Sequence, residues 1–332
     1  MQAPESRVVG PGSSRPHASA PGRGSAVSGL DASLLLMAII WGTNYAIVKS
    51  AFREIDPQAF NALRLALAST VMVLASRTAR RLHLDEDFHT SATVTRDEWI
   101  RLTVLGLVGH CIYQYLFVGG LAQTSVANGA LIISLTPVVI TLASAIGGTE
   151  RVGALHWAGT ALSLAGIYLV VGRGAHVSGA SVRGDLMMMA AVGCWAFYTI
   201  GARPLMARHS PVGVTALTML LGTIVYVPLV STHLAALAWR AVSVTAWLKV
   251  IYSSIFALCV AYTIWYAAVR RIGSARTSIY SNLLPVIAMA TAYVWLHEPI
   301  GAVKLIGASA VLCGVALTRL GKPSRRADVR QL

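Results

Sequence analysis

Charged residues are scarce in this 332-residue chain. Only 12% of its residues are Asp, Glu, Lys or Arg, whereas 55% are hydrophobic, and the mean hydropathy is +0.64. A soluble protein of this length needs a more strongly charged surface to remain in water. The composition therefore excludes a pair of ordinary soluble domains and favours a protein whose solvent is the lipid bilayer.

Acidic residues and cysteines are also few. The 13 Asp and Glu residues fall in predicted tails, loops or helix ends, with "LDED" at 84–87 as the one acidic cluster. An integral membrane enzyme, such as a lipid-modifying transferase, would typically place paired carboxylates or a histidine and a carboxylate at the membrane face. An ATP-driven pump would need a Walker-type glycine loop, which the sequence lacks. These two classes are therefore disfavoured.

The cysteines show no spacing typical of metal ligands. All four lie within apolar segments, where free thiols pack as small hydrophobic groups: Cys111, Cys194, Cys259 and Cys313. We expect no metal site, no cofactor and no catalytic residues.

Long apolar stretches are what the sequence does contain. A helix needs about 20 mostly apolar residues to cross the hydrocarbon core of a bilayer. Ten such stretches occur, near residues 31–49, 58–77, 100–121, 125–147, 153–172, 184–203, 212–232, 246–268, 275–296 and 301–319. Because the connections are short, the sequence predicts an all-α integral membrane protein with ten transmembrane helices and no further domain.

The basic residues indicate orientation rather than nucleic-acid binding. The net charge is +14, but no basic face interleaved with aromatic residues appears, so we expect no nucleic-acid partner. Lys and Arg gather in the even-numbered connections and in both tails, which predicts that both termini are cytoplasmic in a multi-pass protein of the cell (inner) membrane. Residues 1–29, rich in Gly, Pro, Ser and Ala, read as a disordered cytoplasmic tail, and residues 321–332, "GKPSRRADVRQL", as a basic cytoplasmic tail.

The chain matches itself at a fixed offset. A shift of 148 residues superimposes five pairs: Cys111 on Cys259, Pro137 on Pro285, Glu150 on Glu298, Gly159 on Gly307 and Gly166 on Gly314. Further upstream an offset of 154 superimposes Trp41 on Trp195 and Pro57 on Pro211. The sequence thus predicts two five-helix repeats, 30–173 and 184–320. Because five is odd, the second repeat would be inverted in the membrane, an arrangement typical of alternating-access carriers.

The matched prolines mark expected helix breaks. Pro137 and Pro285 fall near the middle of the fourth and ninth predicted spans, where proline removes a backbone donor. Breaks at matching positions in two repeats point to a binding site at the centre, although kinks that only help helices to pack remain an alternative. The matched Glu150 and Glu298, at helix ends, are expected to bind nearby backbone or basic groups rather than to carry protons.

Several longer motifs carry a resemblance to a known family. They are "WGTNYAIVKSAF", the helix-two arginine in "NALRLALAS", "ANGALIISLTPVVITLASAIGGTE" and "ARTSIYSNLLPVIAMATAYVWLHEPIGAVKLIGASAVLCGVAL". Together they resemble the drug/metabolite transporter superfamily, EamA-type, over residues 31–320. The resemblance implies an inner-membrane carrier of ten helices in two inverted repeats around a central cavity, commonly an exporter of amino acids, related metabolites or drugs. The second copy departs from the pattern, since Thr218 replaces Arg64 and Ala196 replaces Gly42.

Polar and aromatic residues inside the spans are the candidate substrate contacts, because polar groups in a membrane usually face a cavity. In the third span His110, Gln114 and Phe117 share one helical face, with Tyr113 beside them. The other candidates are Trp41 and Asn44, Arg64, Trp195 and Tyr198, the eighth-span residues Tyr262, Trp265 and Tyr266, and Asn282 before Pro285. They would suit a small amphipathic organic substrate. Each aromatic residue could alternatively fill a helix interface. For Arg64 the alternative role is a structural salt bridge or a clamp on backbone carbonyl groups.

The expected function is therefore secondary transport of small organic metabolites, amino acids or related amphipathic compounds, in the direction of export. The partners expected are the small-molecule substrate and the bilayer, and a homodimer stays open. His110 is the one histidine well inside a span, so we expect any proton coupling to run through it. An integral membrane lipid-modifying enzyme and a non-transporting membrane sensor are the alternatives.

Overall fold

The computed structural model describes residues 29–82, 92–146, 150–151, 153–169, 179–272, 277, 280–281, 283–320 and 324–325. We call residues 29–169 the first half and residues 179–320 the second half. The helices of the first half are α1 (Gly29–Ala51), α2 (Pro57–Arg81), α3 (Arg96–Gly106), η1 (Leu107–Ile112), α4 (Tyr113–Gln123), α5 (Val126–Ile133), α6 (Thr136–Ile146) and α7 (Ala154–Tyr168). Those of the second half are α8 (Gly179–Met206), α9 (Pro211–Leu229), α10 (Ser231–Ala235), η3 (Trp239–Ala241), α11 (Val244–Tyr252), η4 (Ser253–Val260), α12 (Ala261–Ile272), α14 (Leu283–Leu296) and α15 (Ala302–Leu320).

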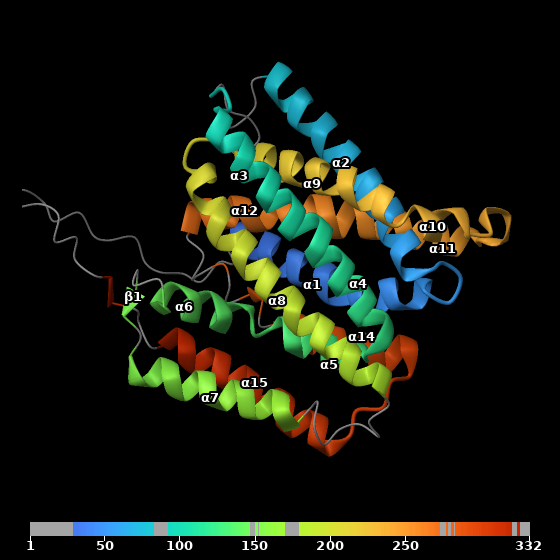
Figure 1. The fold of residues 1–332 in the computed structure, drawn as a ribbon. Coiled ribbons are helices and arrows are strands. Elements are labelled where there is room, and N and C mark those ends of the chain that lie inside the picture. The colour runs from blue at the N-terminus through green and yellow to red at the C-terminus, as the bar shows by residue number, and fades with distance from the viewer. Residues whose placement is uncertain are drawn as a thin grey trace, which may run out of the picture.

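The described part of the chain is helical, as predicted, apart from one short strand pair (Figure 1). Strands β1 (Glu150–Arg151) and β2 (Ser324–Arg325) pair antiparallel. They join the connection after α6 to the segment after α15, so these two parts of the chain lie at the same end of the bundle. The sequence analysis assigned the second part to a tail and did not predict the pairing.

Polar caps fix where several helices begin. The Asp56 carboxylate accepts hydrogen bonds from the backbone amides of Gln58 and Ala59, and Pro57 follows at the first helical position of α2. Ser210 and Pro211 repeat this arrangement at the start of α9, which occupies the matching position in the second half. The offset that superimposes the two prolines in the sequence therefore also superimposes two helix starts.

Not all of the predicted spans are long helices. Within the described residues, six helices could cross a membrane by length and composition: Gly29–Ala51, Pro57–Arg81, Arg96–Gln123, Val182–Met206, Pro211–Leu229 and Val244–Arg271. The fourth predicted span is divided into α5 and α6, while α7 has 15 residues and α14 has 14. The described parts of these helices are shorter than the roughly 20 residues that a span requires. The division of the fourth segment lies beside Pro137, one of the two predicted breaks.

The third and eighth segments contain π-helices at matching positions. Six residues, Leu107–Ile112, form η1 between α3 and α4, and eight residues, Ser253–Val260, form η4 between α11 and α12. Cys111 and Cys259, which the offset of 148 superimposes, lie in these two segments. Single π-helical turns are rare and occur frequently at functional sites. Their recurrence in both halves therefore makes this level of the bundle a candidate functional site.

The two halves pack through equivalent helices. The last helices of the halves, α7 and α15, lie side by side (Figure 1), and α2 packs on α9 in the same way. A Cβ atom added at Gly166 would lie 2.7 Å from the Gly307 carbonyl oxygen, and one added at Gly314 would lie 2.5 Å from the Gly159 carbonyl oxygen. The four glycines that the offset superimposes in pairs thus meet across one helix interface, where small residues let the backbones approach closely.

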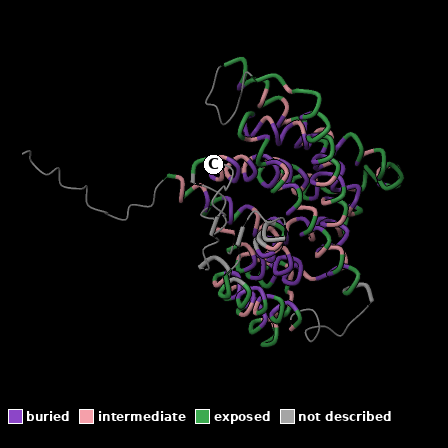
Figure 2. The backbone as a smooth tube through the Cα atoms, turned by 60° about the vertical axis from the view of Figure 1, so that its left-hand side comes forward, coloured by how far each residue is buried: buried purple, intermediate pink, exposed green. Residues whose placement is uncertain are grey.

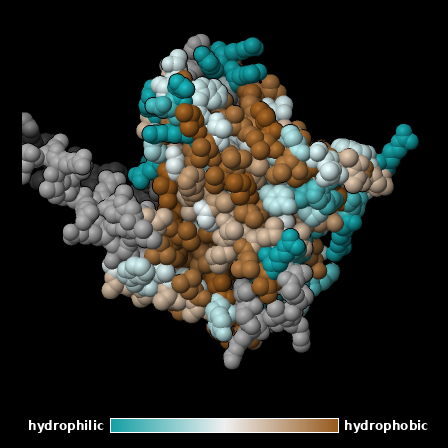
Figure 3. Space-filling model, viewed as in Figure 1, coloured by the Kyte–Doolittle hydropathy of each residue, from teal (hydrophilic) through white to brown (hydrophobic). Residues whose placement is uncertain are grey.

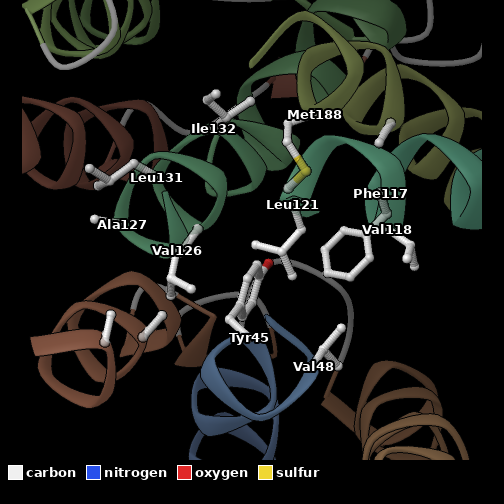
Figure 4. Packing of buried hydrophobic residues seen from close by; sticks show 14 of the residues in the cluster. Tyr45, Val48, Phe117, Val118, Leu121, Val126, Ala127, Leu131, Ile132 and Met188 are labelled. Carbon is white, nitrogen blue, oxygen red and sulfur yellow. The ribbon is translucent and has the colours of Figure 1, made fainter. Parts of the chain in front are cut away.

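The interior contains two hydrophobic clusters. Figure 4 shows part of one, in which Tyr45 of α1 faces Phe117 and Leu121 of α4, with Met188 of α8 beside Leu121. Buried backbone lies inside the bundle, and exposed residues follow its outer helices (Figure 2). Large apolar side chains such as Leu164, Leu186 and Ile224 are exposed on those helices, and Figure 3 shows a broad apolar face with hydrophilic residues gathered towards its edges. An apolar outer surface of this kind suits contact with lipid.

Candidate functional site

Aromatic side chains from both halves meet in the middle of the bundle. The Trp41 ring of α1 lies 5.7 Å from that of Tyr262 and 5.6 Å from that of Trp265, both on α12. The Trp195 ring of α8 lies 5.6 Å from Tyr262 and 5.7 Å from Tyr198. We call Trp41, Trp195, Tyr198, Tyr262, Trp265, Tyr266 and His110 the aromatic cluster. In this conformation its rings pack against one another at distances typical of paired aromatic groups.

The π-helix η4 supplies a polar contact to this cluster. Trp41 Nε1 donates a hydrogen bond of 2.9 Å to the carbonyl oxygen of Ala257. In a π-helix the hydrogen-bond register shifts by one residue, so carbonyl groups can become available to side chains. The indole of α1 thereby ties the first half to the irregular segment of the second half.

His110 lies in η1 at the centre of the aromatic cluster. It is 0% exposed, its ring lies 5.1 Å from that of Tyr198 and 6.1 Å from that of Tyr262, and it packs against Gly222 of α9. Neither ring nitrogen has a hydrogen-bond partner among the residues that the structure describes. A buried imidazole without partners is costly, which makes His110 a candidate to bind a ligand or water.

Asn44 and Trp265 share this property. The Asn44 side-chain oxygen and Trp265 Nε1 are buried, and neither has a hydrogen-bond partner in the described part of the chain. Buried polar atoms normally have partners, and each exception calls for an explanation such as an absent water or ligand. With His110 and the Tyr266 hydroxyl, four of the residues singled out in the sequence thus have buried polar atoms without a partner among the described residues.

Arg64 of α2 is only 1% exposed. Its Nε and Nη2 atoms donate to Asn61 Oδ1 at 3.1 and 2.7 Å, and its Nη1 donates to Ser253 Oγ at 3.1 Å. A further bond runs from Nη2 to Gln114 Oε1. The predicted polar residues Arg64 and Gln114 are therefore brought into contact, but sequence reasoning missed both Asn61 and Ser253.

The two prolines of the predicted helix breaks lie at helix starts. Pro137 is the second residue of α6, after the non-helical Ser134 and Leu135, and Pro285 is the third residue of α14. Both prolines stand in the first turn of a helix, where no intrahelical hydrogen bond to the proline nitrogen is lost. They begin new helices rather than kink continuous ones. Asn282 lies outside the described residues.

One buried carboxylate was missed in the sequence. Asp185 was assigned to a helix end, yet it is the seventh residue of α8 and only 6% exposed. Its carboxylate accepts hydrogen bonds from the Thr124 hydroxyl and from Asn128 Nδ2, the second at 3.4 Å. Because α8 begins well before its apolar run, counting from the apolar stretch misplaced this residue.

The turn between α4 and α5 is held from two sides. Lys49 Nζ of α1 donates to the carbonyl oxygens of Thr124 and Leu121, the latter at 3.2 Å, at the end of α4. Both oxygens of Glu298 accept from the Val126 amide at 3.1 Å, at the start of α5. Glu298 thus binds a backbone group, as expected, and its charge suits a helix N-terminus. The side chain of Glu150 lies outside the described residues.

Two surface cavities lie towards this end of the bundle. One, of about 360 Å³, is lined by Lys49, Phe52, Arg53, Ala122, Leu296 and Glu298. The other, of about 270 Å³, is lined by Glu54, Asp56, His233, Ala236, Leu237 and Ala238. Beside the second cavity, hydrogen bonds donated by Ser243 lower the pKa of Glu54. Neither cavity is lined by the aromatic cluster, and no group of three or more potential metal-ligand side chains occurs in the residues described.

The fold and the site define a class of protein. A bundle of apolar helices built from two equivalent halves, with polar and aromatic groups enclosed between them, is typical of membrane transporters. Residues 30–172 and 182–320 each match the model of the EamA-like transporter family. The chain therefore belongs to the EamA-like transporter family, as the sequence motifs indicated, and this family is one of transporters rather than enzymes.

Known relatives cover most of the chain. It is 27% identical over 289 residues to the uncharacterized transporter YyaM of Bacillus subtilis, covering 85% of this chain and 90% of that protein. It is 23% identical over 301 residues to a "Probable terminal-alkyne amino-acid exporter" of Streptantibioticus cattleyicolor, covering 89% and 95% of the two chains. A solved crystal structure with 22% sequence identity has a similar fold, with a TM-score of 0.61 over 88% of this chain and 98% of that one.

Proposed function

We propose that this family member is a secondary transporter that exports small organic metabolites, amino acids or related amphipathic compounds, by alternating access. The proposal includes ten spans in two inverted five-helix repeats, 30–173 and 184–320, around a central binding cavity. The observation that carries the proposal is that both halves of the chain contribute residues to the aromatic cluster. Trp41 and His110 come from the first half and Trp195 and Tyr262 from the second, so a relative movement of the halves would open and close this level of the bundle.

The exchange of helix contacts between the halves supports the inverted repeats. Helix α1, the first span, packs on α14, the ninth, and α8, the sixth, packs on α5 and α6, the fourth. The second and seventh spans pack on each other, as do the fifth and tenth. Such reciprocal contacts are expected of two repeats related by a pseudo-twofold axis. Because each repeat has an odd number of spans, that axis would lie in the plane of the membrane.

The proposed orientation has both termini in the cytoplasm. The pairing of β1 with β2 supports it in part, because the connection after the fourth span and the segment after the tenth must then lie on one side of the membrane. The basic bias of the loops supports the cytoplasm as that side. Reporter fusions that report the C-terminus outside would contradict the ten-span count.

The proposed substrate contacts are the residues named in the sequence, together with the two prolines that begin α6 and α14 as supports of the cavity. They are Trp41, Asn44, Arg64, His110, Gln114, Trp195, Tyr198, Tyr262, Trp265, Tyr266 and Asn282, with Pro137 and Pro285. The relative named as an amino-acid exporter supports amino acids as the first class of compound to test.

The test is counterflow in proteoliposomes that contain the purified protein, with a panel of radiolabelled amino acids and related metabolites. We expect at least one compound to exchange in a protein-dependent way, and Trp195→Ala to reduce that exchange. Trp157→Ala is the matched control, because Trp157 lies on α7 and is 54% exposed, away from the aromatic cluster. Exchange of no compound by a folded protein, or equal loss in both variants, would contradict the proposal.

A further inference from the structure

Among the described residues, the buried guanidinium of Arg64 has no anionic partner. Each of its partners, Asn61, Gln114 and Ser253, is neutral and itself buried. The ion pairs between described residues involve Glu98 and Asp56, and none of them includes Arg64. A charge removed from water is costly unless an opposite charge compensates it. In the described part of the chain, this site therefore lacks a negative charge beside Arg64.

The geometry of the hydrogen bonds identifies where a negatively charged group fits beside Arg64. Asn61 Oδ1 occupies one edge of the guanidinium, bonding both Nε and Nη2, and so fixes the plane of the group from within α2. The outer edge, formed by Nη1 and Nη2, contacts the single oxygens of Ser253 and Gln114. A planar carboxylate can replace these two separate acceptors with its own two oxygens, in the bidentate arrangement that arginine favours.

Charge balance favours a carboxylate over a phosphate as the group that binds Arg64. The site offers one positive charge from Arg64, which one carboxylate neutralises, whereas a phosphate monoester would carry about −1.5 to −2 into the same buried place. Gln114, which accepts a hydrogen bond from Arg64, lies one turn after His110 of the aromatic cluster. The rings of that cluster would receive an apolar body.

We infer that Arg64 selects a substrate with one carboxylate attached to an apolar or aromatic body, and that Asn61 is the positioning residue of this subsite. The inference rests on the proposed transport function and names its substrate class. Gln114 belongs to the first half and Ser253 to the second. A carboxylate that displaces Ser253 therefore also releases the contact by which Arg64 of the first half joins the second half, which links binding to the relative movement of the halves.

The test measures binding by matched acid and amide pairs to the full-length protein in detergent. The pairs are 3-phenylpropanoate with 3-phenylpropanamide, L-phenylalanine with L-phenylalaninamide, and L-leucine with L-leucinamide. Binding is followed by tryptophan fluorescence and by thermal shift. We expect at least one acid to bind about tenfold or more tightly than its amide, since a hydrogen bond to a charged group is about twice as strong as a neutral one. The result that overturns the inference is the absence of any acid preference.

Two variants test the role of the charge. Arg64→Gln should abolish the preference for the acid, while Arg208→Gln, which removes the same charge from a half-exposed ion pair with Glu98, should retain it. Because Arg64→Gln could prevent folding, Asn61→Asp is the second variant. It keeps the shape of the site and places a resident carboxylate 2.7 to 3.1 Å from the guanidinium. We expect Asn61→Asp to raise the melting temperature and to lose the acid preference; an unchanged preference would overturn the inference.

Counterflow of the same compounds separates this inference from the proposed function. Acids that bind in an Arg64-dependent way but do not exchange across the membrane would refute transport and leave the carboxylate subsite standing. Exchange of the amides at the rate of the acids would leave transport standing and refute the subsite.

Discussion

Replacing Gly314 with alanine tests the interface between the two halves most directly. An added Cβ would lie 2.4 Å from Ser163 Oγ, 2.5 Å from the Gly159 carbonyl oxygen and 2.6 Å from the Ser163 amide nitrogen. Two of these three atoms belong to the backbone of α7, so the clash cannot be relieved by rotating one side chain. We therefore expect α7 and α15 to be pushed apart locally.

The size of the effect follows from two opposing contributions. Overpacking of a tight interior costs about 1–3 kcal/mol, while alanine is favoured over glycine inside a helix by about 0.8–1.0 kcal/mol. Because backbone atoms make the contact, we expect the upper part of the first range and a net loss of roughly 1–2 kcal/mol in the free energy of unfolding. Gly166→Ala should cost a similar amount, since its Cβ would lie 2.7 Å from the Gly307 carbonyl oxygen.

Gly193→Ala is the matched control. Gly193 lies inside α8, is exposed, and has no atom within 4 Å of the position of an added Cβ. Here only the helix preference acts, so this variant should be as stable as the parent protein or more stable. Equilibrium unfolding of the purified variants in mixed micelles measures the difference. If Gly314→Ala were as stable as Gly193→Ala, the close approach of α7 and α15 would be refuted.

Three further variants probe the site and its surroundings. Glu298→Ala removes the acceptor of the Val126 amide and should destabilise the start of α5 by about 1 kcal/mol, seen as faster hydrogen exchange at Val126 but not at the end of α2. His110→Gln should abolish the acceleration of flux by an imposed pH gradient and keep gradient-free exchange. Retained acceleration rules His110 out as the coupling group. Trp41→Phe keeps the ring contacts but loses the hydrogen bond to η4, so we expect a loss of about 1 kcal/mol in stability; an unchanged melting temperature would show that this bond contributes nothing.

Equivalent positions in the two repeats of the sequence predict contacts of the fold. Gly159 and Gly307, and Gly166 and Gly314, were noticed only as coincidences at one offset, yet in the structure they meet across one interface. Where two backbones approach closely the residue must be small, so glycine recurs at that position in both repeats. The membrane class and the family likewise followed from composition and motifs, because both depend on many residues at once.

The helix types and the partners of Arg64 could not be obtained in this way. The π-helix η1 differs from an α-helix by one step in the hydrogen-bond register over six residues, which hydrophobic periodicity does not resolve. The partners Gln114 and Ser253 are separated from Arg64 by 50 and 189 residues. Asn61 was within reach, since it lies one turn before Arg64 and can share its face, but it was overlooked because apolar neighbours surround it in the sequence.

The differences between the two repeats carry the chemistry of the site. Where Arg64 stands in α2, the second copy has Thr218 in α9, whose hydroxyl lies 3.1 Å from that of Tyr198. Where Gln114 stands beside Arg64, the second copy has Tyr262. At these two positions the first half therefore offers a cation and an amide group, whereas the second half offers a hydroxyl group and a tyrosine ring. A carrier with two identical halves would bind a substrate in two equivalent orientations, whereas these halves favour one, with the carboxylate towards α2 and the apolar body towards α8 and α12.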